Sequence, residues 1–390
     1  MPTISSAPYI SYLINYFIPL IYLLINFKSV SVITKRQSIL LFLLLLLFII
    51  SILVPIFHET NDFSYLTVSS SPLRNIPVYL FLYTIVFKKY KNNKPIDMFI
   101  YYFILTHVLY VIVTMLFVFS PSIKNAWFSV FSKNIISDRL LESFGYTFRI
   151  GWIGFSGFRI TMYCTLCTIL TLYLLKKDTK SSVISKKILY FAYIMCIIGN
   201  IFYGRIGIIV SIISNVIILI KPNKIKIKQT LIILMTILSM TLFIASTRNI
   251  EPFRDLYIWA LTPIKNLITR GEFDNYSVNN MKKMNVVPTD ETLMLGDGYF
   301  TYDNKYYMET DLGYLRNIYY WGIICTIIAY ATTYYSLKGS RKVNKQLFLS
   351  LLVAVTMFEI KGISYFEFIP ILFIIDYYEI LGTKGARLND

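Results

Sequence analysis

Long apolar runs dominate this sequence and constrain its fold more than any other feature. They lie at residues 9–27, 38–57, 73–87, 98–119, 156–175, 188–203, 206–220, 229–246, 313–336, 347–360 and 363–381. Most approach the ~20 residues that an α-helix needs to cross ~30 Å of hydrocarbon. Charged residues make up only 15% of the chain, against about 25% in soluble domains. The sequence therefore predicts an all-α integral membrane protein with about eleven transmembrane helices, a single polytopic membrane domain over residues 1–390.

Basic residues lie in dense clusters between alternate apolar runs. The clusters are at Lys28–Arg36, Lys88–Lys94, Lys176–Lys187, Lys221–Lys228, Lys338–Lys345 and Lys384–Arg387. Loops rich in lysine and arginine stay on the cytoplasmic side of a membrane. The pattern therefore predicts an external N-terminus, a cytoplasmic C-terminus and two long external loops at 120–155 and 247–312. Because topology accounts for much of the net charge of +17, we do not expect nucleic acid as a partner.

Arginine is concentrated on the predicted external side, where topology alone does not require it. The arginines there are Arg74, Arg139, Arg149, Arg159, Arg205, Arg248, Arg254, Arg270 and Arg316, whereas the cytoplasmic clusters hold only Arg36, Arg341 and Arg387. A guanidinium group presents a planar fork of donors that matches phosphate oxygens, and it works when partly buried. We therefore expect an outward-facing site for a polyanionic group, most simply a diphosphate.

Two of these arginines are predicted to lie below the outer membrane surface. Residues 188–220 have lysines at both ends and must form a hairpin, each arm of which reaches only ~24 Å. Arg205, at its tip, therefore needs a partner or a polar cavity, because a charge near mid-membrane costs about 2.5–3.5 kcal/mol. Arg159 follows three glycines between Gly151 and Gly157, which would permit a kink or a close helix contact. The alternative is that both arginines extend to lipid phosphate.

A second short hairpin is predicted at residues 347–381. Glu359, Lys361 and Gly362 would form its tip, and Glu367 would follow one turn later. Either these charges form ion pairs with one another, or they contribute to the external site.

The long external loop begins with a predicted amphipathic helix. Apolar residues recur at helical spacing from Phe253 to Leu267, as expected of a helix that lies in the membrane interface. Its polar face carries Arg254, and Arg270 and Glu272 follow at its end.

The same loop ends in a second set of polar and aromatic residues. Gly296-Asp297-Gly298 predicts a turn, and the tyrosine-rich stretch after it suits stacking on sugar rings or an interfacial aromatic belt. Asp311, Gly313 and Arg316 come as the chain re-enters the membrane.

These features together resemble the O-antigen or capsule repeat-unit polymerase family, usually called Wzy. The resemblance rests on the hydropathy profile, one dominant external loop, the R-G-E at Arg270–Glu272, and the G-D-G followed by TDLGYLRNIYYWGI. Motif-level similarity covers residues 248–323. The resemblance implies a non-Leloir glycosyltransferase that joins oligosaccharide units carried on undecaprenyl diphosphate at the outer face of the bacterial inner membrane. Its expected partners are those lipid-linked donors and acceptors, membrane lipid, a chain-length regulator and a flippase.

The chain departs from the related lipid A-core ligase pattern. That pattern relies on a histidine in the external loop, whereas His58 and His107 are the only histidines here and neither lies in residues 247–312. Ligase activity is therefore not expected.

The residue types support such chemistry on their own terms. Breaking a sugar–diphosphate bond develops negative charge on the leaving group, which fixed arginines can stabilise without a metal or other cofactor. The candidate diphosphate ligands are Arg159, Arg205, Arg248, Arg254, Arg270 and Arg316. A carboxylate must accept the proton of the acceptor hydroxyl, and Asp311 is the first candidate, with Glu272 and Glu142 as alternatives.

A lipid-linked oligosaccharide flippase or other transporter is the alternative function. It too needs a cationic cavity, but its basic residues should line a central pathway instead of gathering at the outer face. Cys164 and Cys167 form a C-x-x-C inside an apolar run, where a metal or redox role is not expected. His107 is expected to serve helix packing.

Overall fold

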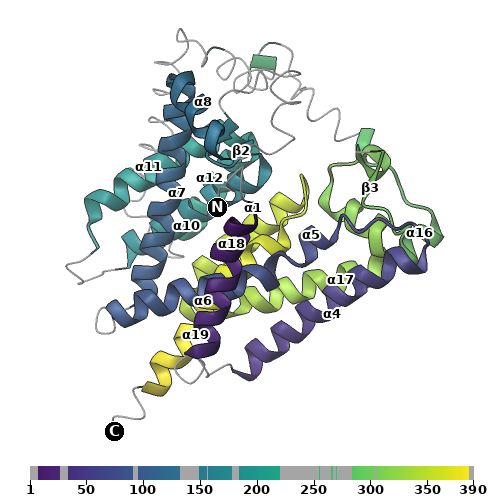
Figure 1. The fold of residues 1–390 in the computed structure, drawn as a ribbon, viewed down its shortest axis with the longest axis horizontal. Coiled ribbons are helices and arrows are strands. Elements are labelled where there is room, and N and C mark those ends of the chain that lie inside the picture. Colours follow the sequence, from purple (N-terminus) through teal and green to yellow (C-terminus); the bar gives the residue numbers. More distant parts are fainter. Residues whose placement is uncertain are drawn as a thin grey trace. The chain divides into compact units, whose positions relative to one another are not determined.

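The computed structural model describes residues 8–26, 34–90, 95–131, 149–155, 157–177, 184–219, 254, 265–266, 269, 283–303 and 305–385. These residues form two compact units (Figure 1). The first unit comprises Met1–Ile18, Val86–Phe273 and Leu349–Ala354, and the second comprises Pro19–Ile85, Asp274–Phe348 and Val355–Asp390, as far as each is described.

The chain is mostly helical, as the apolar runs predict. The helices are α1 (Pro8–Tyr12), π-helix η1 (Leu13–Phe17), α2 (Ile18–Ile25), α4 (Lys35–Phe57), α5 (Leu66–Ser69), α6 (Ser71–Lys89), α7 (Pro95–Phe119), α8 (Pro121–Val130), α10 (Phe158–Lys176), α11 (Lys186–Tyr203), α12 (Arg205–Leu219), α16 (Asp290–Leu295), 3-10 helix η3 (Tyr307–Glu309), α17 (Gly313–Val343), α18 (Lys345–Glu359) and α19 (Tyr365–Gly385). Two short antiparallel hairpins pair β1 (Ile150–Gly151) with β2 (Gly154–Phe155), and β3 (Thr301–Tyr302) with β4 (Lys305–Tyr306).

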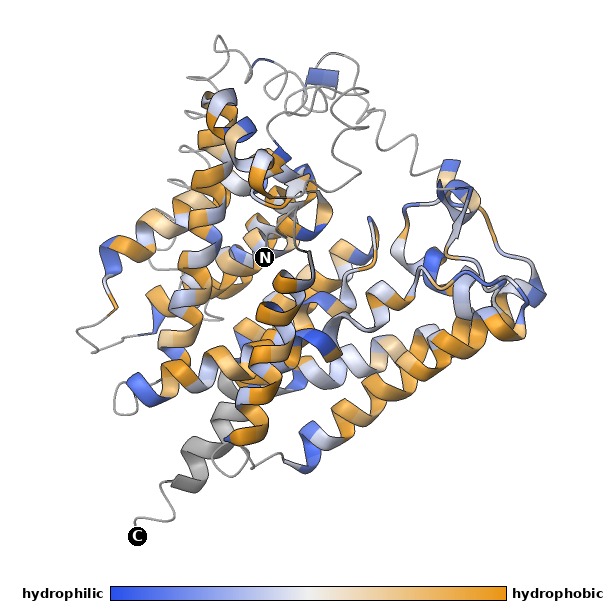
Figure 2. Cartoon of the chain, in the orientation of Figure 1, coloured by the Kyte–Doolittle hydropathy of each residue, from blue (hydrophilic) through white to orange (hydrophobic). Residues whose placement is uncertain are grey.

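Several of these helices identify a membrane protein. Among the described residues, α4, α7, α10 and α11 are each long and apolar enough to cross a bilayer. Figure 2 shows α4 as hydrophobic along most of its length. Every predicted apolar run that falls in the described residues is helical, whereas the run 229–246 lies outside them.

The first unit packs α7, α10, α11 and α12 around buried polar side chains. Asn200 of α11 accepts a hydrogen bond from Thr165 of α10 at 3.1 Å and donates one to Ser211 of α12 at 2.9 Å. Such bonds satisfy polar groups that lipid cannot. At the end of α10, Lys177 forms an ion pair of 2.7 Å with the buried Asp97 of α7.

The glycines before Arg159 do not kink a helix. Gly151 and Gly154 face each other in the β1–β2 hairpin, and Gly157 only precedes α10, which begins at Phe158. Gly151 does serve a close contact, because a Cβ atom there would overlap the Tyr110 ring of α7. Of the two predicted alternatives, the close contact is therefore the one present.

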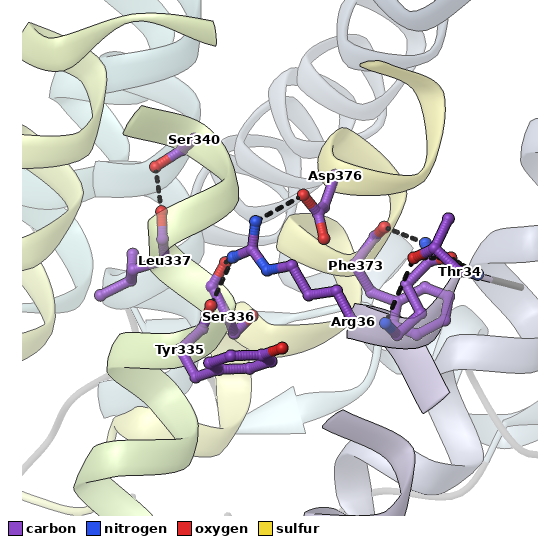
Figure 3. A network of polar contacts seen from close by, with 9 residues as sticks. Thr34, Arg36, Tyr335, Ser336, Leu337, Ser340, Phe373 and Asp376 are labelled. Carbon is purple, nitrogen blue, oxygen red and sulfur yellow. Dashed lines mark hydrogen bonds and ion pairs between the residues drawn. The ribbon is translucent and has the colours of Figure 1, made fainter. Parts of the chain in front are cut away.

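In the second unit, α17 packs against α4 and α19, and a largely buried ion pair connects α4 with α19. Arg36 of α4 donates hydrogen bonds to Asp376 of α19 at 2.8 Å and to the Tyr335 carbonyl of α17 at 2.5 Å (Figure 3). Its guanidinium carbon also lies 5.2 Å from the centre of the Tyr335 ring. The next residue, Gln37, donates to the Phe373 carbonyl at 3.5 Å. This polar network connects α4, α17 and α19.

Helix α17 is broken at Gly322, where the backbone has a φ of 75° and a ψ of 176°. The break removes the helical partners of the Tyr319 and Tyr320 carbonyls. The Gly296-Asp297-Gly298 turn supplies replacements, because Asp297 N–H donates to Tyr319 O at 2.6 Å and Gly298 N–H donates to Tyr320 O at 3.2 Å. Gly296 and Gly298 both have positive φ, in keeping with the predicted turn, and the segment caps the interrupted helix.

Replacing Gly322 with alanine should destabilise the second unit strongly. The φ and ψ of this residue lie in a region that is essentially restricted to glycine and costs roughly 1–3 kcal/mol for other residues. An added Cβ would also overlap the Met294 carbonyl. The measurement is thermal unfolding of the detergent-purified protein, with Ile324→Ala on the exposed face of the same helix as the control. Equal unfolding midpoints for Gly322→Ala and the wild type would contradict the role of the break.

Candidate functional site

Arg316 is the centre of the candidate site in the second unit. It lies near the start of α17 and is only 9% exposed. Its guanidinium carbon lies 3.5 Å from the centre of the Tyr306 ring and 4.1 Å from that of Phe300. Its Nε is buried without a hydrogen-bond partner, and among the described residues no carboxylate forms an ion pair with it.

This arrangement leaves a buried positive charge only partly compensated. A desolvated cation–π contact contributes about 2 kcal/mol, whereas burying an ion costs several kcal/mol. Arg36 in the same unit illustrates the compensated case, since Asp376 and a helix carbonyl accept its hydrogen bonds. The donors of Arg316 are instead suited to receive an anion.

The aromatic rings on Arg316 are held in place by Asp62, in the segment between α4 and α5. One oxygen of its carboxylate accepts hydrogen bonds from the backbone N–H of Phe300 at 2.6 Å and of Thr301 at 2.7 Å. Nearby, the Thr60 hydroxyl donates to the Gly298 carbonyl at 2.8 Å. Burial raises the pKa of Asp62, but hydrogen bonds from Ser64, Thr301 and Phe300 outweigh it, so the net pKa lies below its usual value.

Asp311 and Lys361 lie at the edge of the same site. The Asp311 carboxylate is near enough for its charge to act on Arg316, and it forms an ion pair of 3.6 Å with the Lys361 ammonium. Their side chains are 39% and 34% exposed, respectively. Thus the structure brings together Asp311 and Arg316, which were both predicted as site residues, and adds Lys361.

The predicted ion pairing within the α18–α19 hairpin is wrong for Glu359 and Lys361. Lys361 pairs with Asp311, outside the hairpin, whereas Glu359 is buried and accepts hydrogen bonds. Its donors are Asn317 at 3.0 Å and Tyr330 at 3.1 Å on α17, and Ser364 within the hairpin. Neutral donors replace the expected cation because the hairpin tip packs against α17.

A hydrogen-bonded group of tyrosines extends this network. The Tyr65 hydroxyl donates to Asn317 Oδ1 at 2.9 Å and is also hydrogen-bonded to the Tyr365 hydroxyl. Tyr65 stacks on Tyr320, with ring centres 4.4 Å apart, and meets Phe300 edge to face at 4.9 Å. The side of the site that faces the protein is therefore filled by hydrogen-bonded and packed side chains.

The tyrosine-rich stretch makes more contacts within the protein than the sequence predicts. Tyr306 covers Arg316, and Tyr299 stacks on Tyr307 with ring centres 5.2 Å apart. Burial and the neighbouring Asp297 carboxylate raise the pKa of Tyr307 to about 12, so its hydroxyl stays protonated. Tyr302 remains 61% exposed and is the residue in this group best placed to stack on a sugar ring.

The other predicted arginines fall in the first unit or outside the described residues. Arg159 is exposed at the start of α10, and Arg205 is half-buried at the start of α12, so both belong to the first unit. Arg254 is exposed. Residues outside the described ranges are Arg248, Arg270, Glu272, Glu142 and most of the predicted amphipathic helix 253–267.

The described residues contain no group of three or more His, Cys, Asp or Glu side chains that could hold a metal ion. Cys164, Cys167, Cys196 and Cys325 are all free. His107 hydrogen-bonds to the Phe103 carbonyl at 2.9 Å within α7, which fits its predicted packing role.

Sequence reasoning missed the groups that enclose Arg316. Phe300 and Tyr306 looked like members of a general aromatic stretch, and Asp62 lies in another loop far along the chain. One available signal was the absence of basic residues between His58 and Ser71, which predicts a further external segment by the positive-inside rule. Comparison with known protein families, characterised proteins and solved structures finds no match for this chain.

Replacing Asp62 with asparagine should lower stability at neutral pH and have less effect in acid. Because the folded-state pKa is depressed, the stabilisation is complete above the unfolded value of ~3.9 and is lost as pH falls through the folded value. We expect a thermal midpoint lowered by roughly 2–4 °C at pH 7. The control is Asp303→Asn, at the exposed tip of the β3–β4 hairpin, whose first residue, Thr301, binds Asp62. A deficit that persists unchanged from pH 7 to pH 3 would contradict this assignment.

Proposed function

We propose that this protein is a polysaccharide polymerase that joins oligosaccharide repeat units carried on undecaprenyl diphosphate. The observation that supports it is Arg316, a buried guanidinium without a carboxylate partner among the described residues. A diphosphate supplies the missing anion, and the exposed Tyr302 offers a ring for a sugar. The resemblance of residues 248–323 to the Wzy family favours the same activity.

In this proposal Arg316 stabilises the leaving group and Asp311 accepts a proton. The acceptor hydroxyl forms a bond to C1 of the donor sugar while the bond from C1 to the diphosphate oxygen breaks. The proton of the hydroxyl passes to the Asp311 carboxylate, and undecaprenyl diphosphate departs with its charge held by guanidinium. Arg159, Arg205, Arg248, Arg254 and Arg270 remain proposed diphosphate ligands, and Glu272 remains the alternative base.

A bacterial inner-membrane location and about eleven spans complete the proposal. The two polar networks of the second unit support a spanning arrangement. On α17, Arg316 precedes the break at Gly322 by six residues and Tyr335 follows it by thirteen, so the two networks lie toward opposite ends of the helix. The Arg36 network would then lie at the cytoplasmic surface and Arg316 near the external one. A chain-length regulator and a flippase are proposed partners.

The alternative is a transporter for lipid-linked oligosaccharides. The break of α17 at Gly322 favours it, because interrupted helices are frequent at transporter binding sites. Reconstitution separates the two functions. New glycosidic bonds from purified lipid-linked units indicate a polymerase, whereas a change of sidedness without new bonds indicates transport.

Arg316→Lys should reduce polymerisation about a hundredfold, because a point charge does not reproduce the two-donor contact with a diphosphate. Polymer is measured from purified lipid-linked units with the reconstituted variant. Arg36→Lys is the matched control, since it alters the compensated arginine of the same unit. We expect that variant to be less stable but active per folded molecule. Wild-type polymer yield from Arg316→Lys would overturn the proposal.

The same assay tests the expectation that no metal or other cofactor takes part. Guanidinium groups would neutralise the leaving group, so excess EDTA should leave polymer yield unchanged. Activity that is lost in EDTA and restored by Mg²⁺ or Mn²⁺ would refute this mechanism.

Thiol labelling should place residue 303 outside the cell membrane and residue 338 inside. Asp303 and Lys338 are both exposed, and their replacement by cysteine, one at a time in a Cys325→Ala background, gives a reactive label site. An impermeant maleimide added to intact spheroplasts should react at position 303 only. Reaction at 338 and not at 303 would invert the proposed topology.

A further inference from the structure

The turn between α18 and α19 is fixed tightly to the start of α17. A Cβ atom on Gly313 would lie 2.5 Å from the Gly362 carbonyl oxygen and 2.7 Å from that of Glu359. Within the turn, Glu359 Oε2 accepts hydrogen bonds from the Ser364 N–H at 2.8 Å and from its hydroxyl at 2.9 Å. Its other oxygen accepts from Asn317, the residue after Arg316, at 3.0 Å. The backbone that carries Lys361 is therefore positioned against the helix that carries Arg316.

The side chain of Lys361 is held much more loosely than its backbone. Its ammonium nitrogen lies 3.6 Å from Asp311 Oδ2, and both side chains are about one third exposed. Ion pairs of this kind contribute only about 0–1 kcal/mol. Lysine is a compact charge on a flexible stem, so it can exchange one partner for another without moving the backbone.

We infer that Lys361 is the second cation of the anion site, paired with Asp311 until an anion binds and with the anion afterwards. This inference rests on the proposed function. A diphosphate held by Arg316 carries more negative charge than a carboxylate and attracts the ammonium more strongly. When Lys361 turns to the phosphate oxygens, the Asp311 carboxylate loses its ion-pair partner.

The consequence for catalysis is that donor binding prepares the base. Before the exchange, Asp311 Oδ2 lies 3.6 Å from the Lys361 ammonium. After it, that oxygen is available to the acceptor hydroxyl. Glu359 then acts as a positioning residue, because it fixes the turn that presents Lys361 beside Arg316.

The test is inorganic pyrophosphate binding to the purified full-length protein in nanodiscs, measured by calorimetry. Lys361→Met should weaken binding about tenfold, the value of one charge-assisted contact. Asp311→Asn should tighten it about threefold, because the competing carboxylate is gone. In the double variant the gain from Asp311→Asn should shrink, since there is no ammonium left to release. Lys361→Arg should retain binding within about threefold.

Lys305→Met provides the control for simple loss of one positive charge. Lys305 forms a 2.7 Å ion pair with Glu309, but both side chains are largely exposed. Equal weakening by Lys305→Met and Lys361→Met would overturn the inference, and so would additive effects of the Lys361 and Asp311 variants. If Arg316→Lys weakens binding and Lys361→Met does not, the inference fails while the proposed function stands. No binding of pyrophosphate to the wild type refutes both.

Discussion

Enclosing a guanidinium charge between two aromatic rings is the constraint on which the second unit depends. An arginine on a mainly apolar helix must be either neutralised by an anion or wrapped by groups that tolerate its charge. Arg36 follows the first solution with Asp376, and Arg316 follows the second with Tyr306 and Phe300. Much of the surrounding architecture holds those two rings in register.

Three separate segments contribute to that register. Asp62 fixes the backbone of Phe300 and Thr301, the Gly296–Gly298 turn docks on the interrupted helix, and Glu359 joins the α18–α19 turn to Asn317. Each uses charged or backbone hydrogen bonds that are buried or part-buried, and such bonds are stronger than they would be in water. The outcome is a buried arginine that contacts two aromatic rings and forms no ion pair among the described residues.

The sequence predicts helices well because the apolar runs are long and their ends carry lysine. It also predicts the tight hairpin at Arg205 and the turn at Gly296–Gly298, where length and glycine leave few alternatives. The break at Gly322 is not visible, since a single glycine in an apolar run is common in membrane helices. The β1–β2 hairpin is also missed, because only two residues pair on each side.

The candidate site is predictable only in part, for a related reason. Arg316 and Asp311 are neighbours in the sequence, so their residue types indicated a shared role. The contacts of Phe300 with Asp62 and of Asp311 with Lys361 join segments far apart along the chain. No periodicity or motif encodes such pairings. They follow from how the helices pack, which residue types alone do not determine.

The fit of the Gly296–Gly298 turn into the break at Gly322 also limits how this protein can diverge or be engineered. The backbone N–H groups of Asp297 and Gly298 donate to the carbonyls of Tyr319 and Tyr320. The number of residues from the turn to the break at Gly322 is therefore fixed, and we call this segment the cassette. An insertion before Thr289 leaves the cassette intact, whereas a deletion between Thr301 and Leu312 shifts one half against the other. Chimaeras that exchange external loops between such proteins should therefore join upstream of Thr289 and downstream of Gly322, carrying the turn and its matching helix break together.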